Sequence, residues 1–186
     1  MAQIRIRGLT LDNFKCHKHL ELLFDGKDAS IYGDNAAGKT SVYDGLMWLL
    51  FGKDSNGNGE KNMEIKPLDS TGAVIDHEAV TAVEAELLVD GEPMVLRRTF
   101  REVWATRRGS SEAVFDGNTS EYYINGVPQK KNGFDERIRE LVSEETFRLL
   151  TSVSYFARDL SWQKRREVLF DMIEEAVEVN NDGSAT

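Results

Sequence analysis

Cysteine is nearly absent from this sequence, because Cys16 is the single one among 186 residues. One thiol excludes an internal disulfide and any zinc site built from several cysteines. A chain of this length is long enough to form one domain with a sizeable core. Such sparse cysteine usage suits a reducing compartment, and we expect a cytoplasmic protein.

The sequence also lacks an excess of basic residues and any long apolar run. It has 23 Lys and Arg against 32 Asp and Glu, for a formal net charge of -9. This charge argues against a surface that wraps nucleic acid through bulk electrostatics, so any such contact must be local. The first residues alternate apolar Ile4 and Ile6 with charged Arg5 and Arg7, which predicts neither a signal peptide nor a bilayer span. No membrane partner is expected.

Alternating apolar residues predict several strands. Ile4, Ile6, Leu9 and Leu11 predict an opening strand, either regular or bulged at Gly8. Further strands are predicted over 20–24, 29–32, 79–104 as a pair, 121–127 and 151–156.

Turn residues divide these strands. Asp90-Gly91 and Asn125-Gly126 are dipeptides typical of tight hairpins. The polar, basic stretch 13–19 predicts a turn that presents its side chains.

Helical spacing of apolar residues predicts a helix over 40–51 that Gly52 ends. One or two short helices are predicted over 134–150, with a restart at Ser143, and another over 162–173. The stretch 53–62 has no apolar periodicity and predicts a mobile surface loop without chemistry. We expect a lobe over 1–173 and an acidic tail, linker or coiled-coil start over 174–186.

A phosphate-binding loop stands out between the strand predicted over 29–32 and the helix predicted over 40–51. The run 33–40 matches G-x-x-x-x-G-K-[ST]. Backbone N–H groups at a helix amino end converge on phosphate oxygens there, and the helix dipole favours negative charge. The residues expected to bind nucleotide are Gly33, Asp34, Asn35, Ala36, Ala37, Gly38, Lys39, Thr40 and Ser41.

Three of these residues have further expected roles. Lys39 reaches the β and γ phosphates as a catalytic cation, and Thr40 acts with it by ligating magnesium through its hydroxyl. Ser41 adds a hydroxyl near the α phosphate. The sequence therefore predicts binding of ATP with Mg²⁺.

The surroundings of the loop argue against two classes of phosphate-loop protein. Small nucleotide kinases open with the loop almost at once, whereas about thirty residues precede Gly33 here. A GTPase needs a guanine-reading N-K-x-D after the loop, and the sequence has none.

Three stretches together resemble a known family. They are Asn13-Phe14-Lys15 after the opening strand, the run 32–41, and Asp44-Gly45-Leu46 in the following helix. The chain is similar to the N-terminal ATPase lobe of the SMC, RecF and SbcC class of ABC-type ATPases, which act on DNA. The runs Tyr155-Phe156 and 162–166 are most similar to phage or prophage members of the SbcC type.

The resemblance implies a fold and two further site residues. The expected fold is α/β, a P-loop NTPase lobe with a mixed, partly antiparallel sheet. Lys15 falls where the family keeps a basic residue beside the nucleotide, with Cys16 near it. From composition alone, a solvated turn lysine explains Lys15 equally well.

The same resemblance implies that other parts complete the site. The glutamine of the family's Q-loop belongs close to Phe156, but Gln163 lies seven residues later. The chain has no LSGG-like signature, and Asp90 and Asp171 are better explained by a hairpin turn and a helix surface than as catalytic acids. A C-terminal lobe and a second protomer would then supply what is missing, DNA would bind the assembly, and a nuclease is a candidate partner.

Two basic clusters are candidates for DNA contact or for solvated surface. They comprise Arg97, Arg98, Arg101, Arg107 and Arg108, and Lys164, Arg165 and Arg166. His17, His19 and His77 show no metal-ligand spacing. Two other functions stay open: a nucleotide-binding regulatory module that never hydrolyses, and phosphotransfer to a small acceptor.

Overall fold

The computed structural model describes residues 3–106, 113–152 and 154–170. The chain folds into two compact units, 1–141 and 142–186. The first unit holds the sheet and the phosphate loop, and the second holds short helices. The lobe expected over 1–173 stays a prediction, and the tail expected over 174–186 lies outside the described residues.

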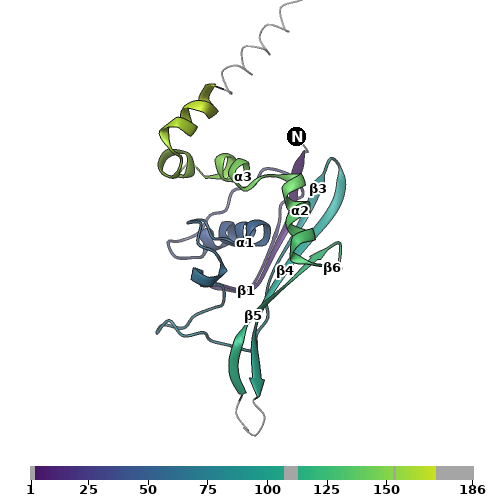
Figure 1. Ribbon diagram of the computed structural model, residues 1–186, viewed down its shortest axis with the longest axis vertical. Coiled ribbons are helices and arrows are strands. Elements are labelled where there is room, and N and C mark those ends of the chain that lie inside the picture. Colours follow the sequence, from purple (N-terminus) through teal and green to yellow (C-terminus); the bar gives the residue numbers. More distant parts are fainter. Residues whose placement is uncertain (1–2, 107–112, 153, 171–186) are drawn as a thin grey trace, which may run out of the picture. The chain divides into compact units, whose positions relative to one another are not determined.

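One six-stranded sheet forms the framework of the first unit (Figure 1). Every pairing between its strands is antiparallel in the described residues, and the spatial order is β2-β1-β3-β4-β5-β6. The strands are β1 Ile4–Phe14, β2 His17–Leu23, β3 Thr81–Val89, β4 Glu92–Thr106, β5 Ala113–Ile124 and β6 Val127–Gln129. A sheet of this kind with packed helices confirms the α/β class.

The opening strand β1 is bulged, as the sequence allowed. Its pairing with β3 shifts register between Ile6 and Gly8, after which Leu9, Leu11 and Phe14 are buried. The turn to β2 occupies only residues 15–16, much less than the predicted 13–19. Pairing of Phe14 with His17 extends the ladder to the turn and leaves few residues outside it.

The two dipeptide turns are confirmed. Asp90 and Gly91 have φ angles of 53° and 90°, and Asn125 and Gly126 have 50° and 77°. Both turns therefore take the left-handed backbone that two-residue hairpins require.

Helix α1, Lys39–Phe51, packs on the sheet beneath the phosphate loop. Met47, Trp48 and Leu49 are fully buried. Gly52 ends the helix at φ 69°, and its N–H donates to the Trp48 carbonyl at 2.9 Å. The predicted helix and its end are confirmed.

The stretch 53–62 is a loop, as predicted, but side-chain hydrogen bonds hold it, and its expected mobility stays a prediction. Asp54 is 5% exposed and accepts hydrogen bonds from the backbone N–H groups of Asn56 and Asn58 and from the Asn58 amide. A 3₁₀ turn, η1, follows over Glu60–Asn62. Side-chain hydrogen bonds organise this segment, and apolar periodicity does not report them.

The strand expected over 29–32 does not form among the described residues. The segment is not paired to any strand of the sheet, and Ile31 and Tyr32 are 43% and 89% exposed. A β-strand needs a hydrogen-bonded neighbour, and an apolar run signals burial without supplying one.

Helix α2, Lys131–Leu141, completes the first unit and buries Phe134 and Ile138. In the second unit α3, Glu144–Thr151, begins where predicted, because the Ser143 hydroxyl accepts from the Thr146 N–H at 3.0 Å.

The strand expected over 151–156 is wrong. Thr151 is the last residue of α3, and its hydroxyl donates to the Phe147 carbonyl at 2.6 Å. The π-helix η2 then spans Tyr155–Asp159, and a further helix covers 162–170. Local hydrogen bonds, such as that from the Ser152 N–H to the Arg148 carbonyl at 2.9 Å, satisfy the described backbone without a strand partner.

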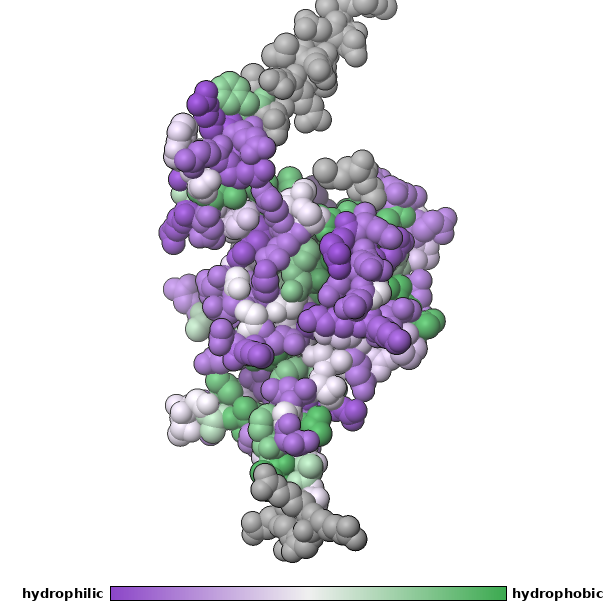
Figure 2. Space-filling model, viewed as in Figure 1, coloured by the Kyte–Doolittle hydropathy of each residue, from purple (hydrophilic) through white to green (hydrophobic). Residues whose placement is uncertain are grey.

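Apolar side chains gather at the far end of the β4–β5 hairpin, green in the lower part of Figure 2. The rings of Trp104 and Phe115 meet edge to face there, with their centroids 5.6 Å apart, and the two residues are 44% and 48% exposed.

None of the helices in the described parts of the chain is long and apolar enough to cross a membrane.

Candidate functional site

The phosphate loop bends through two left-handed residues before α1 begins. Ala36 has φ 65° and Gly38 has φ 88°. Gly38 is the N-cap of α1, and no side chain caps the helix there. The first-turn N–H groups have no intrahelical partner, so this helix end is shaped to meet an anion.

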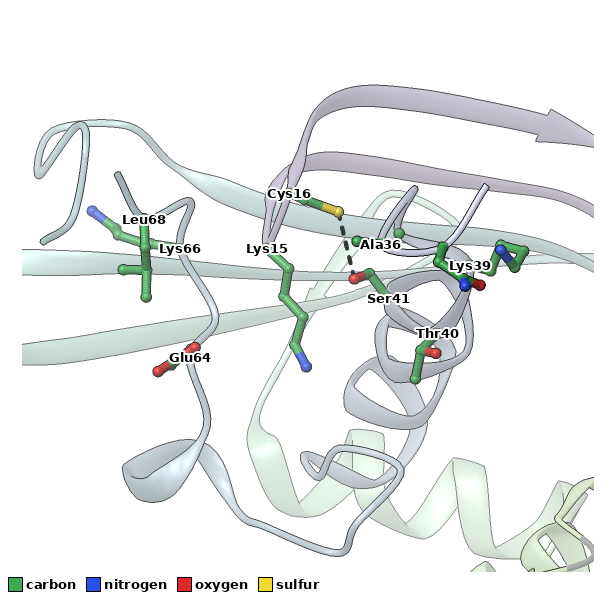
Figure 3. Close-up of a pocket in the computed structure, with 11 residues that line it drawn as sticks. Lys15, Cys16, Ala36, Lys39, Thr40, Ser41, Glu64, Lys66 and Leu68 are labelled. Atoms are coloured by element: carbon green, nitrogen blue, oxygen red, sulfur yellow. Dashed lines mark hydrogen bonds between the residues drawn. The ribbon is translucent and has the colours of Figure 1, made fainter. Parts of the chain in front are cut away.

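The turn between β1 and β2 packs directly against the loop. A Cβ on Gly38 would lie 2.5 Å from Cys16 Sγ and 2.5 Å from His17 Nε2. His17 Nε2 is 3.1 Å from the Gly38 carbonyl oxygen, and Cys16 Sγ is 3.6 Å from Ser41 Oγ (Figure 3). Two observations therefore favour glycine at position 38: its left-handed φ angle and the close approach of the Cys16 and His17 side chains.

Lys39 folds back over the loop that precedes it. Its Nζ donates to the carbonyl oxygens of Gly33 and Asp34, each at 2.6 Å. Both Lys39 and Thr40 are exposed at the first turn of α1. The ammonium and the hydroxyl are thus accessible to a ligand that approaches the helix end.

These groups open onto a cavity of about 520 Å³. Its walls contain six residues predicted from the phosphate-loop motif and two predicted from the resemblance: Asn35, Ala36, Gly38, Lys39, Thr40 and Ser41, with Lys15 and Cys16. The predicted residues Gly33, Asp34 and Ala37 do not line it, and the first two instead hold Lys39 through their carbonyls.

Lys15 is not a solvated turn lysine. Its Nζ donates to Asp44 Oδ2 at 2.6 Å, with the two side chains 22% and 5% exposed. Asp44 Oδ1 accepts from the Ser55 N–H at 2.8 Å. Asp44 falls within the family resemblance, but the sequence predicted no role for it. Its position four residues after Thr40, on the same helix face, was the available signal.

The wall opposite the loop was not predicted. It is formed by Glu64, Lys66 and Leu68, which Figure 3 shows across from α1, with Lys15 between. Lys66 is 4% exposed; its Nζ donates to the His77 carbonyl at 2.6 Å and lies 3.4 Å from Glu102.

Glu102 sits in a strongly charged environment behind that wall. Burial raises the pKa of its carboxyl, but the hydrogen bond with His77 and the charges of Lys66 and His77 lower it more. The net pKa lies below the ordinary value. Glu102 is therefore held ionised as part of the structure around the cavity.

The first basic cluster is not a free DNA-facing surface. Arg98 is 3% exposed, so neither of the two roles considered for it, DNA contact or a solvated strand edge, is correct. Arg97 pairs with Glu84 and Arg101 with Glu121. Arg107 and Arg108 lie outside the described residues.

The residues of the second basic cluster also make contacts within the chain. Lys164 pairs with Glu167 at 3.2 Å, Arg165 donates to the Ala157 carbonyl, and Arg166 lies over the Trp162 and Phe170 rings. These contacts favour the solvated helix face over a free phosphate-binding surface.

The remaining candidate acids and the Q-loop position can also be located. Asp90 lies in the β3–β4 turn, as its hairpin interpretation required, and Asp171 lies outside the described residues. Phe156 is in η2, and Gln163 lies in the helix over 162–170, both in the second unit.

An antiparallel sheet that carries a phosphate-loop helix agrees with the N-terminal lobe of an SMC, RecF and SbcC class ATPase, which the sequence resemblance implied. The chain belongs to the family described as an AAA domain, AAA_23, whose model matches residues 8–181.

Curated relatives agree with this family. The chain is 44% identical over 57 residues to the DNA double-strand break repair Rad50 ATPase of Saccharolobus solfataricus, a match that covers 31% of the chain and 7% of that protein. It is 22% identical over 160 residues to the DNA replication and repair protein RecF of Thermomicrobium roseum, covering 78% of the chain and 40% of that protein. The chain thus spans well under half the length of these relatives.

Solved structures share the fold. One, from a study of ATP-driven dimerization and DNA stimulated activation of SMC ATPases, has a TM-score of 0.58 at 18% identity and covers 90% of this chain and 99% of its own. The Smc head domain of Pyrococcus yayanosii, with a coiled coil and joint, has a TM-score of 0.51 at 18% identity, covering 95% of this chain and 36% of its own.

Proposed function

We propose that this chain is the ATP-binding lobe of an ATPase of the SMC and SbcC type, which couples ATP binding and hydrolysis to DNA processing. The observation that carries the proposal is the amino end of α1: it has no side-chain cap, the left-handed Ala36 and Gly38 precede it, and Lys39 lies across it. Backbone amides and a lysine converging on one point suit a polyphosphate.

Lys39 acts by exchanging its two carbonyl contacts for the β and γ phosphate oxygens. The carbonyls of Gly33 and Asp34 hold the ammonium within the loop, so little side-chain freedom is lost on binding. Charge-assisted contacts to phosphate are stronger than those to a neutral carbonyl, which makes the exchange favourable.

Thr40 fits the role of a magnesium ligand. Its hydroxyl is exposed at the start of α1, and a hydroxyl with phosphate oxygens and water is a donor set that Mg²⁺ accepts. Bound there, Mg²⁺ would neutralise charge on the phosphates. Ser41 and Cys16, 3.6 Å apart, form the adjoining wall near the α phosphate.

Hydrolysis requires parts that we assign to partners. A C-terminal lobe would supply an Asp-Glu pair, and a second protomer the signature residues, giving an ATP-dependent dimer. The unpaired segment containing Ile31 and Tyr32 supports such a partner, since its exposed apolar side chains suit a strand that is covered in the whole protein.

DNA binding and a nuclease partner belong to that assembly and not to this lobe alone. In the first basic cluster Arg98 is buried and Arg97 and Arg101 pair with carboxylates, and the net charge of the chain is -9. DNA would therefore meet a local surface completed by the partners. The single cysteine, Cys16, suits the cytoplasm as the compartment.

Nucleotide binding by the Lys39→Ala variant tests the proposal. We expect isothermal calorimetry with ATP and Mg²⁺ to show binding to the wild-type chain and none to this variant. Lys130→Ala removes an exposed lysine of the same unit and serves as the matched control. Undiminished ATP binding by Lys39→Ala would overturn the proposed role of the loop.

The alternative is a nucleotide-binding regulatory module without hydrolysis. Turnover of the chain with and without a matching C-terminal lobe separates the two. Stimulation by the lobe supports the ATPase, and inertness in both arms supports the module. ATP consumption that requires a small acceptor and not DNA would instead indicate phosphotransfer.

A further inference from the structure

The buried carboxylate of Asp44 lies between the nucleotide cavity and a segment that does not line it. One oxygen accepts from Lys15 Nζ at 2.6 Å, and the other accepts from the Ser55 N–H at 2.8 Å. Asp44 is 4% exposed and is not among the residues that line the cavity. Among the contacts of Asp44, the one that leads to the cavity is therefore its pair with Lys15.

Lys15 is fixed at both of its ends. Its backbone has φ 50°, and its N–H donates to the Ile65 carbonyl at 2.7 Å. Its ammonium is held by Asp44, while the stem lines the cavity beside Cys16. A lysine with one donor committed has two N–H donors left for a ligand.

The segment 53–59 in turn fixes Asp44. Asp54 accepts from the N–H groups of Asn56 and Asn58, and Lys53 bridges Gly59, which sets the position of the Ser55 amide. The segment 53–59 thus helps to fix the Asp44 carboxylate, which in turn holds Lys15 at the cavity wall.

We propose that Asp44 is a positioning residue that holds the Lys15 ammonium where it can contact the phosphates of the nucleotide. This inference rests on the function proposed above. Separating Lys15 from Asp44 would leave a buried charge without a partner. The free-energy cost of that exceeds the gain from one additional charge-assisted hydrogen bond between Lys15 and an exposed ligand. The pair therefore persists, and Lys15 reaches the phosphates with its remaining N–H groups.

Asp44→Asn tests the proposal, because the amide is isosteric and has a single acceptor oxygen. Lys15 and the Ser55 N–H donate to different oxygens of Asp44, so in the amide one of these two donors faces an NH₂ group that cannot accept. We expect the dissociation constant for ATP with Mg²⁺ to rise about tenfold, as for the loss of one charge-assisted contact.

A double-mutant cycle separates positioning from general destabilisation. Lys15→Met should weaken ATP binding at least as much, and Asp44→Asn should add nothing further in the Lys15→Met background. The double variant lacks both charges, so it leaves no unpaired buried ion and should fold. Thermal unfolding of each variant shows that the comparison is made between folded proteins.

The outcomes separate this inference from the proposed function. ATP binding by Asp44→Asn that equals or exceeds the wild type would overturn the positioning role, as would additive losses in the double variant. If Lys39→Ala also binds ATP normally, the site itself is wrongly assigned; if Lys39→Ala fails to bind, only the Asp44 role falls.

Discussion

The guanidinium of Arg98 lies over the indole ring of Trp48, 4.8 Å from the ring centroid, and its Nη1 donates to the Trp48 carbonyl at 2.7 Å. The guanidinium also lies over the Tyr122 ring, 4.9 Å from its centroid, and Nη2 donates to Glu60 Oε1 at 2.6 Å. One side chain of β4 thus joins the end of α1, the η1 turn and β5.

Arg98→Ala is expected to lower the free energy of unfolding by about 3 kcal/mol, because it removes stacking from two rings and the cation that balances Glu60. Chemical denaturation followed by circular dichroism measures this loss. Arg97→Ala, on the same strand, breaks a half-exposed pair with Glu84 and should cost less than about 1 kcal/mol. Equal losses for the two variants would contradict a structural role peculiar to Arg98.

Gly38→Ala is expected to abolish ATP binding and to destabilise the fold by about 1–2 kcal/mol from its left-handed backbone alone. The added methyl would also meet Cys16 Sγ and His17 Nε2 at 2.5 Å. Calorimetry with ATP and thermal unfolding check both effects. Gly59→Ala is the matched control, since its φ is -77° and its Cβ would meet nothing within 4 Å. A Gly38→Ala variant that bound ATP like the wild type would contradict the need for glycine at this position.

Thr40→Ala is expected to remove the part of ATP affinity that depends on Mg²⁺, because the methyl cannot ligate a metal. Titrations with ATP in Mg²⁺ and in EDTA measure that part. Thr40→Ser keeps the hydroxyl and should retain it. If Thr40→Ala kept the full Mg²⁺ dependence, the metal ligand would have to be sought elsewhere.

Glu102→Gln is expected to lower thermal stability at neutral pH, and the difference from the wild type should shrink in acid. The folded-state pKa of Glu102 lies below its ordinary value of 4.5. Its ionised form therefore stabilises the fold above that value, and the contribution is lost as the pH falls through the lowered folded-state pKa.

Melting temperatures between about pH 7 and about pH 3 check the Glu102 prediction. Glu86→Gln, an exposed residue of β3, makes the same charge change and serves as the reference. A Glu102→Gln difference that stayed constant with pH would show that packing, not ionisation, is responsible.

Local signals in the sequence were enough to predict the hairpins, the main helix and the phosphate loop. Asp90-Gly91 and Asn125-Gly126 specify turns through their own backbone preferences, and Gly52 and Ser143 mark helix ends in the same way. Each of these signals acts within a few residues, so one sequence is sufficient to find it.

Features that depend on distant partners were missed. The Lys15–Asp44 pair joins residues 29 positions apart, and Glu60 meets Arg98 across 38 positions. Neither separation leaves a local pattern. The strand predicted over 29–32 also depended on a distant partner. Its apolar composition is typical of a strand, but no neighbouring strand pairs with it among the described residues.

Gly45 lies where α1 packs on β1, and a Cβ there would collide with Leu11 Cδ2 while making an ordinary contact with Phe14. The absence of a side chain at position 45 therefore lets the helix backbone pack closely on the strand. The height of the first turn of α1 above the sheet depends on this close packing. We therefore expect the site to accommodate different phosphate-bearing molecules through the residues ahead of Gly38 and through side chains, and not through movement of α1 on the sheet.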